Sequence, residues 1–130
     1  DQLRKTLESL GKSQTNHLED VSKNIEKLKV KDISKVFLED AFKIIKEKEK
    51  NIHFQFLEKK FNLIFCDPPF KNENIDVLIE MIFLQKILEK NGIIILHRSK
   101  TTKEKLPNYF EIVDERTYGM SKIIFGKFLP

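Results

Sequence analysis

The 130-residue chain is poor in the residues that cross-link, ligate metals or anchor a protein in a membrane. Its single cysteine, Cys66, excludes an internal disulfide and favours a reducing, cytoplasmic location. The apolar runs are too short for a membrane-spanning helix, and the first residues lack the apolar core of a signal peptide. The three histidines have no metal-ligand spacing, and no Gly-x-Ser-x-Gly nucleophile motif is present. We therefore expect a soluble protein with no metal site and no membrane partner.

What the chain does have is enough apolar sequence for one folded domain. Hydrophobic residues make up 40% and charged residues 34%, as in ordinary globular proteins, and 130 residues suffice for a single core. The net charge is only +4, but residues 97–127 hold seven basic and four acidic residues and so carry most of that surplus. A basic segment of this kind is weak evidence for nucleic acid. We expect one domain over residues 1–130.

Hydrophobic periodicity predicts an alternation of helices and strands. The expected helices cover residues 1–10, 17–29 with Asn16 as the cap, 41–50, and 75–90 with Asn91-Gly92 as the end. The expected strands cover residues 35–38, 62–66, 93–96, 109–118 and 122–129. Residues 51–60 and 97–107 are expected to be loops, and Gly119-Met120 a turn. This order predicts an α/β fold with a mainly parallel sheet and a C-terminal antiparallel hairpin. Residues 62–66 indicate a buried strand, and the continuous apolar run at 93–96 is typical of a strand covered on both faces.

One stretch carries chemistry: Asp67-Pro68-Pro69-Phe70, directly after the expected strand at 62–66. Open α/β sheets bind ligands at the carboxyl ends of their strands. The two prolines stiffen the turn and remove backbone donors, and a carboxylate beside a free carbonyl offers only acceptors. Such acceptors can hold an amino group, and Phe70 offers a flat face on which a nucleobase can stack. These residues therefore predict a binding site for the exocyclic amine of a base. The alternative interpretation is a tight turn capped by Asp67.

This motif and its flanking sequence resemble the Rossmann-like S-adenosylmethionine-dependent methyltransferases. Among them, the chain is similar to the bacterial RsmD family, which methylates the exocyclic amine of a guanine in 16S ribosomal RNA. The resemblance covers about residues 17–128 and is strongest in Glu39-Asp40-Ala41-Phe42, in residues 61–70 and in Arg116-Thr117-Tyr118-Gly119. It implies a cytoplasmic monomer whose partner is ribosomal RNA or a small-subunit precursor.

The resemblance also implies a role for each matching residue. Asp67 and the carbonyl of Pro68 would bind the target amine, and Asp40 would accept a hydrogen bond from the adenine amine of S-adenosylmethionine. The implied catalytic residues are Asp67, Pro68, Pro69 and Phe70. The implied cofactor-binding residues are Asp40, Ala41 and Asp67. The implied RNA-binding residues are Arg98, Lys100, Arg116 and Tyr118.

The chain departs from the family in the part that precedes Asp67. The family binds the methionine part of its cofactor on a glycine-rich loop, because glycines let backbone N–H groups approach a ligand closely. Here only Gly11 precedes Asp67, and no apolar strand leads into it. The second strand, whose terminal acid normally holds the ribose hydroxyls, is also missing. We therefore expect a partial domain whose N-terminal strands are missing or truncated. His97 stands where an acid is common, and the sequence assigns it no role.

Two other functions stay open at this point. A DNA adenine-N6 methyltransferase uses a similar acid-Pro-Pro-aromatic motif, although its aromatic residue is more often tyrosine and a target-recognition domain is usual. A non-catalytic RNA-binding or truncated remnant of the RsmD family would also fit a chain without the glycine-rich loop. A test of cofactor binding distinguishes the remnant from the two enzymes. A comparison of methyl transfer to guanine and to adenine substrates distinguishes the two enzymes from each other.

Overall fold

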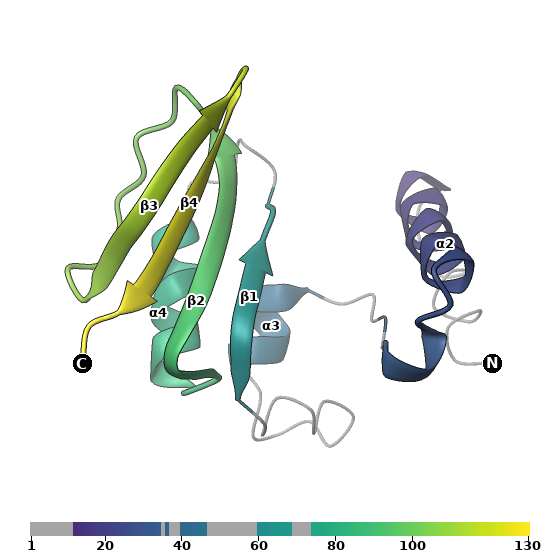
Figure 1. Cartoon of the computed structure of the whole chain (residues 1–130), viewed down its shortest axis with the longest axis horizontal. Helices are drawn as coiled ribbons and strands as arrows, with labels where there is room; N and C mark the ends of the chain where they lie inside the picture. The colour runs from purple at the N-terminus through teal and green to yellow at the C-terminus, as the bar shows by residue number, and fades with distance from the viewer. Residues whose placement is uncertain (1–11, 35, 37–39, 47–59, 69–73) are drawn as a thin grey trace. The chain divides into compact units, whose positions relative to one another are not determined.

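The computed structural model describes residues 12–34, 36, 40–46, 60–68 and 74–130 (Figure 1). It divides into two compact units, Asp1–Asp40 and Ala41–Pro130. The expected helix at 1–10, the second half of the helix at 41–50 and all but Val36 of the strand at 35–38 lie outside the described residues. The same holds for Pro69 and Phe70.

The first unit contains helix α2 (Lys12–Lys27) and the short 3-10 helix η1 (Lys31–Ile33). α2 begins five residues before the predicted start and includes Asn16, which therefore does not cap it. Residues 12–16 are all polar, so apolar periodicity could not reveal this first turn. The helix ends where Lys29 adopts a left-handed backbone with φ 58°. The N–H groups of Lys29 and Val30 donate to the carbonyls of Glu26 and Ile25, which is the Schellman arrangement with lysine in place of glycine.

The second unit is built on a mixed four-stranded sheet. Its elements are α3 (Ala41–Lys46), β1 (Phe61–Cys66), α4 (Ile75–Leu84), β2 (Leu88–Ser99), β3 (Phe110–Tyr118) and β4 (Ser121–Phe128). The strand order is β1-β2-β4-β3. β1 and β2 are parallel, whereas β4 is antiparallel to both β2 and β3. Of the described strands, β1, β2 and β3 therefore run in the same direction and β4 alone runs against them, as expected for a mainly parallel sheet with a C-terminal antiparallel hairpin. The connection from β2 to β3 is a loop and not a helix.

The predicted C-terminal hairpin is confirmed. β3 and β4 pair as far as Tyr118 and Ser121, and Gly119 makes the turn with φ 57°. This left-handed backbone suits glycine, which has no Cβ to clash.

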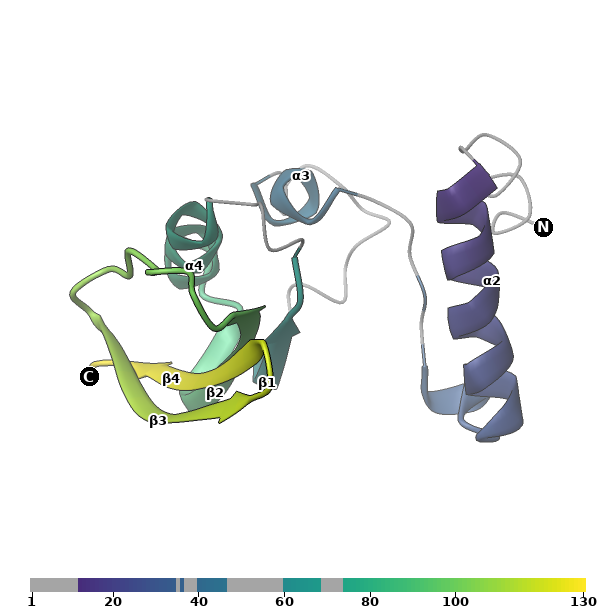
Figure 2. The ribbon, with the colours of Figure 1, turned by 90° about the horizontal axis from the view of Figure 1, so that it is seen from above.

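The core lies between the sheet and one layer of helices. Both α3 and α4 cover the same face of the sheet (Figure 2). α4 places Ile75, Ile79 and Ile82 on that face at helical spacing, and each is at most 2% exposed. They form one cluster with Ile94 and Leu96, which are fully buried on β2. Burial of each such side chain contributes roughly 1.5–3 kcal/mol, so this cluster fixes α4 on the sheet and β2 beneath it.

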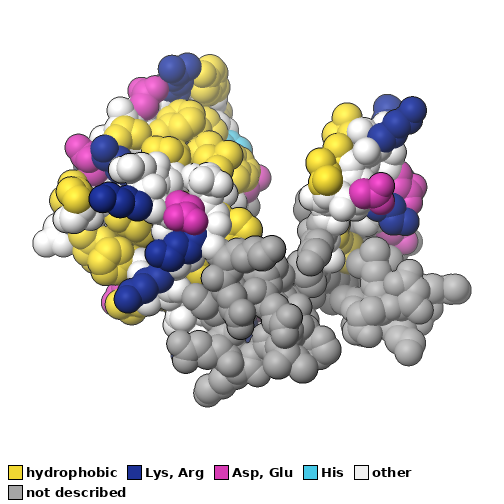
Figure 3. Space-filling model, turned by 60° about the horizontal axis from the view of Figure 1, so that its bottom comes forward, with side chains coloured by type: hydrophobic (Ala, Val, Ile, Leu, Met, Phe, Trp, Pro, Cys, Tyr) yellow, Lys and Arg dark blue, Asp and Glu magenta, His cyan; other side chains and the backbone are white. Residues whose placement is uncertain are grey.

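The opposite face of the sheet carries exposed apolar side chains. On β1, Leu63 is 56% exposed and Phe65 59% exposed, so the prediction of a buried strand is wrong for this face of β1. The reason is that no described helix of this unit covers that face, and alternate residues of a strand point to opposite sides. Hydrophobic side chains accordingly gather on the surface of the unit (Figure 3).

The connection between α4 and β2 also differs from the prediction. α4 ends at Leu84 and not at residue 90, because Lys86 takes a left-handed backbone with φ 54°. Asn91 and Gly92, predicted to terminate the helix, belong to β2. The register jumps from Phe61–Leu88 to Leu63–Ile93, so these residues form a bulge in β2. At its other end β2 continues to Ser99, three residues into the predicted loop, because residues 97–99 pair with β4.

Candidate active site

Asp67 lies at the carboxyl end of β1, one residue after the buried Cys66. In the parallel register of β1 and β2, Cys66 pairs with Leu96. The residues that follow, Asp67 and His97, therefore lie side by side at the carboxyl ends of two neighbouring strands. This is the edge at which open α/β sheets bind ligands.

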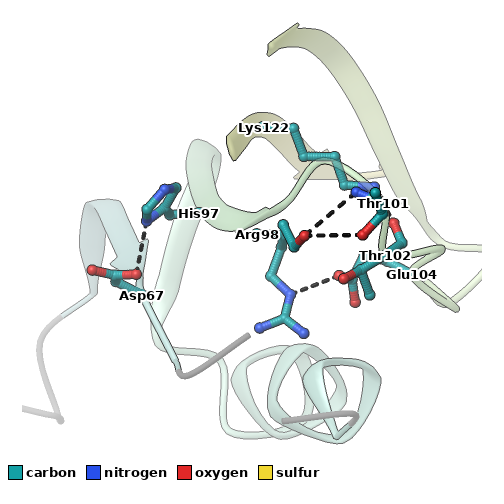
Figure 4. Close-up of polar contacts among 8 residues, drawn as sticks. Asp67, His97, Arg98, Thr101, Thr102, Glu104 and Lys122 are labelled. Carbon is teal, nitrogen blue, oxygen red and sulfur yellow. Dashed lines mark hydrogen bonds and ion pairs between the residues drawn. The ribbon is translucent and has the colours of Figure 1, made fainter. Parts of the chain in front are cut away.

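The side chains of Asp67 and His97 point toward each other, with His97 Nδ1 2.9 Å from Asp67 Oδ1 (Figure 4). An ionised carboxylate only accepts hydrogen bonds, so Nδ1–H is the donor. The Asp67 side chain is 56% exposed and the His97 side chain 27% exposed. The bond goes to Oδ1, which leaves Oδ2 available to a donor that arrives from solution.

Cys66 fixes the backbone just before Asp67. Its side chain belongs to the buried core cluster with Leu96 and Ile94. Burial raises the pKa of the Cys66 thiol to about 11, because the thiolate would lose its hydration. The thiol is therefore neutral near pH 7 and acts as a packing group, as expected for a buried cysteine.

Arg98 is fully buried on the helix-covered side of β2, and its Nε donates to Glu104 Oε1 at 2.6 Å (Figure 4). The Glu104 side chain is only 5% exposed, so both charges of this ion pair are inside the protein. A guanidinium with no exposed surface cannot contact a phosphate, so this structure does not support the prediction that Arg98 binds RNA. Arg98 instead holds the segment that follows β2.

The segment after β2 is attached to the hairpin at two further points. The N–H of Lys100 donates to the carbonyl of Met120 at 2.8 Å, and Lys122 Nζ donates to the carbonyl of Thr102 (Figure 4). Glu104, the one acid of residues 100–107, already neutralises Arg98. The segment therefore presents three exposed cationic residues: Lys100, Lys103 and Lys105.

Arg116 and Tyr118 lie exposed on the edge strand β3. Hydrogen bonds to Tyr118 and to Asp114 raise the pKa of Arg116 above its ordinary value, so the guanidinium stays charged. Arg116 pairs with Ile123, and Ile123 pairs with His97, so these residues form one row on the same face of the sheet. At about 4.8 Å between neighbouring strands, Arg116 lies roughly 15 Å from Asp67 along this row.

The implied cofactor-binding residues come from both units of the chain. Asp67 lies at the end of β1, whereas Asp40 is an exposed residue of the first unit and Ala41 begins α3. The second unit has two surface hollows, of about 360 and 220 Å³. The first is lined by Asp76 and Glu80 of α4 and by residues 105–109, and the second by residues 88–92 and 127–130. Neither hollow includes Asp67. The group near Asp67 that these observations do show is a pair of acceptors for an amine, the Asp67 carboxylate and the Pro68 carbonyl.

No group of three or more histidine, cysteine or carboxylate side chains is placed to hold a metal ion within the described ranges. No helix in the described part of the chain is long and apolar enough to cross a membrane.

Sequence reasoning missed His97 and Glu104. The signal for His97 is its position 30 residues after Asp67, since Leu63 to Cys66 pair with Ile93 to Leu96 at the same offset. That offset becomes readable only when the two strands are known to be neighbours. No sequence pattern marks Glu104, because it contacts Arg98 across a loop.

The comparisons with known proteins agree with this architecture. The model of a family described as "Conserved hypothetical protein 95" matches residues 9–127. A stretch of 66 residues, 51% of this chain, is 30% identical to an uncharacterized methylase of Rickettsia prowazekii and covers 28% of that protein.

Three solved structures have the same fold. A candidate methylase from Haemophilus influenzae is 19% identical with a TM-score of 0.61, covering 87% of this chain and 66% of that one. A conserved hypothetical protein from Streptococcus pyogenes is 22% identical with a TM-score of 0.66, covering 82% and 61%. A candidate methyltransferase from Escherichia coli is 18% identical with a TM-score of 0.61, covering 87% and 59%. The chain thus spans less than two thirds of the length of each of these relatives.

Proposed function

Because the chain belongs to the family described as "Conserved hypothetical protein 95", the RsmD-like group, we propose that it acts in an S-adenosylmethionine-dependent methyltransferase that modifies the exocyclic amine of a guanine in 16S ribosomal RNA. The methylase names of its relatives support a methyl transfer. The observation that carries the proposal is the Asp67 carboxylate, exposed at the carboxyl end of β1 and followed by the Pro68 carbonyl.

The chemistry of an aromatic amine explains why two acceptors are useful. Its nitrogen lone pair is delocalised into the base and is a poor nucleophile. The Asp67 carboxylate and the Pro68 carbonyl accept its two N–H donors, which turns the lone pair out of conjugation and stabilises the positive charge that develops on nitrogen. S-adenosylmethionine would supply the methyl group, and Asp67 and Pro68 orient the amine that receives it.

The basic residues of the second unit support RNA as the substrate. The lysines of residues 100–105 and the charged Arg116 are exposed on the segments that flank β2 and β4. Contacts from such cations to phosphates supply most of the sequence-independent affinity of nucleic-acid-binding proteins. In this proposal Asp67 selects the amine, and the cations hold the RNA around it.

The test is a methyl-transfer assay on small-subunit precursor RNA, with calorimetric titration of S-adenosylmethionine as the first step. Once the modified nucleotide is mapped, a matched RNA with inosine in place of that guanosine removes only the exocyclic amine. We expect transfer to the guanosine RNA and none to the inosine RNA.

The same assay decides between the alternatives. Transfer to adenine in DNA, with none to the guanosine RNA, would establish an adenine-N6 methyltransferase instead. Absence of both cofactor binding and transfer would mean that the chain is a non-catalytic member of the family, and RNA binding would then be measured directly.

A further inference from the structure

We propose that His97 is a positioning residue for the amine-binding carboxylate: its Nδ1–H holds Asp67 Oδ1 so that Oδ2 faces the substrate. This inference rests on the proposed function, because it assigns a task to His97 within the same site. The observation behind it is the 2.9 Å contact between His97 Nδ1 and Asp67 Oδ1.

Asp67 needs such a partner because, among the described residues, His97 is the one side chain that holds its carboxylate. It follows the last residue of β1, and its side chain is 56% exposed. The terminal torsion of an aspartate is broad, so an unsupported carboxylate samples many orientations. Methyl transfer requires the amine within a narrow range of distance and angle, and an error of about 1 Å can cost on the order of 100-fold in rate.

His97 is suited to fix Asp67 because it stands on a rigid element. β2 is hydrogen-bonded to β1 on one side and to β4 on the other, and His97 itself pairs with Ile123. Its neighbours along the strand, Leu96 and Arg98, have no exposed surface. A donor carried by a paired, buried strand holds its partner more accurately than one carried by a loop.

The residue type matters as well as the place. A carboxylate at position 97 would lie beside Asp67 and repel it. An apolar side chain would leave Asp67 without a donor. Histidine supplies a ring N–H to Oδ1, and its shape places that N–H one bond beyond Cγ, close to the backbone.

This geometry allows a matched set of variants. The amide nitrogen of asparagine lies near the position of histidine Nδ1, whereas that of glutamine lies near the position of Nε2. We therefore compare His97→Asn, His97→Gln and His97→Ala for kcat and KM in the RNA methyl-transfer assay. His97→Asn should stay within about threefold of the natural protein, since it keeps the donor. His97→Gln and His97→Ala should lose on the order of 10- to 100-fold in kcat with little change in KM for RNA.

A second measurement tests the hydrogen bond without any activity. Long-range ¹H–¹⁵N NMR at about pH 8.5, where ordinary imidazoles are neutral, reports which ring nitrogen carries the proton. We expect the Nδ1–H tautomer for His97 in the natural protein and its loss in Asp67→Ala.

The two readouts separate the possible failures. Equal kcat for the natural protein, His97→Gln and His97→Ala would overturn the positioning role, and so would an Nε2–H tautomer that does not respond to Asp67→Ala. If the natural protein transfers no methyl group to any substrate, the proposed function falls and the positioning role falls with it. The NMR result would then still decide whether the hydrogen bond exists.

Discussion

At the scale of single residues, Asp67 is the group on which the proposed chemistry depends. Asp67→Ala removes both acceptor oxygens, and we expect kcat for methyl transfer to fall by on the order of 100- to 1000-fold, as for loss of one preorganised group that stabilises transition-state charge. Asp67→Asn keeps one acceptor and should retain part of the rate. The control is Asp32→Ala, an exposed acid of η1 in the other unit, which should leave kcat unchanged.

The far-ultraviolet circular dichroism of both Asp67 variants should match that of the natural protein, because an exposed residue after a strand contributes little to folding. Full activity of a folded Asp67→Ala variant would show that the amine is bound elsewhere.

Cys66 allows a second prediction at this scale. With a pKa raised to about 11 from the ordinary 9.0, its folded-state thiolate is about 100-fold scarcer near neutral pH. Alkylation by iodoacetamide should therefore be at least about 100-fold slower in buffer than in denaturing urea. Equal rates in the two solutions would mean that the thiol is accessible.

The same pKa difference makes stability depend on alkaline pH. The unfolded chain releases the Cys66 proton near pH 9 and the folded chain near 11, so the unfolded state binds fewer protons in this window. Stability therefore falls as pH rises through it, by about 2–3 kcal/mol in total from this group. The check is the pH dependence of urea unfolding for the natural protein minus that for Cys66→Ala.

Single residues of the candidate site differ in whether their roles could be predicted from the sequence. Asp67 and Pro68 could be predicted as a site, because an acid followed by two prolines at a strand end has few structural explanations. Arg98 was assigned to RNA because sequence shows charge but not burial. His97 and Glu104 could not be found, since each acts through a partner that only the folded chain brings near.

At the scale of elements, Gly126 of β4 is required by a close contact and not by its backbone angles. A Cβ at this position would lie 2.0 Å from the ring of Phe110 on β3. We expect Gly126→Ala to destabilise the protein by about 1–3 kcal/mol through overpacking. Phe110→Leu in the same chain should recover part of this loss by making room, and urea unfolding of both variants measures it. An additive effect of the two substitutions would contradict this account.

The buried ion pair between β2 and the following segment gives the second prediction at this scale. Glu104→Leu removes the carboxylate beside the fully buried Arg98, which we expect to cost on the order of 3–5 kcal/mol in free energy of unfolding. The double variant Arg98→Met with Glu104→Leu removes both charges and should be more stable than Glu104→Leu alone. A double variant that is less stable would show that Arg98 is stabilised mainly by groups other than Glu104.

Helices and strands were predicted well where the spacing of apolar residues fitted only one of these elements, and poorly where it fitted both. β1 and the β3–β4 hairpin were found to within one or two residues, because apolar runs bounded by turn residues leave little choice. The end of α4 was missed because Ile87 continues its helical spacing, yet Lys86 turns the chain and Ile87 leads into β2. The extension of β2 to Ser99 was missed because polar residues there are ordered by pairing with β4.

At the scale of the whole molecule, the three lysines after β2 give a prediction about RNA binding. Replacing Lys100, Lys103 and Lys105 by glutamine should weaken binding and reduce the slope of log affinity against log salt concentration by up to about 2. The matched control replaces three lysines of the other unit, Lys23, Lys27 and Lys31, and should change the slope less. Fluorescence anisotropy over a salt series measures both. If both triple variants lost RNA affinity and salt dependence equally, the lysines after β2 would contribute only through the net charge of the protein.

The overall α/β class and the directions of the described strands could be read from the order of helices and strands, but the place of β4 between β2 and β3 could not. Residues 100–109 carry the chain from β2 to β3 and leave room for β4 between these strands, but they are too polar to show a hydrophobic period that would reveal this. The exposed face of β1 was also unpredictable, because burial of a strand depends on which layers surround it and not on its own sequence.

The bulge in β2 has a consequence for how this chain can change over evolutionary time. The extra residues of β2 lie between Leu88 and Ile93, near the start of both strands. From the Leu63–Ile93 pair to the Cys66–Leu96 pair the register is regular. Insertions and deletions between α4 and Ile93 can therefore be absorbed before the strands reach Asp67 and His97. Related chains are free to vary in length in that connection while the two side chains stay adjacent.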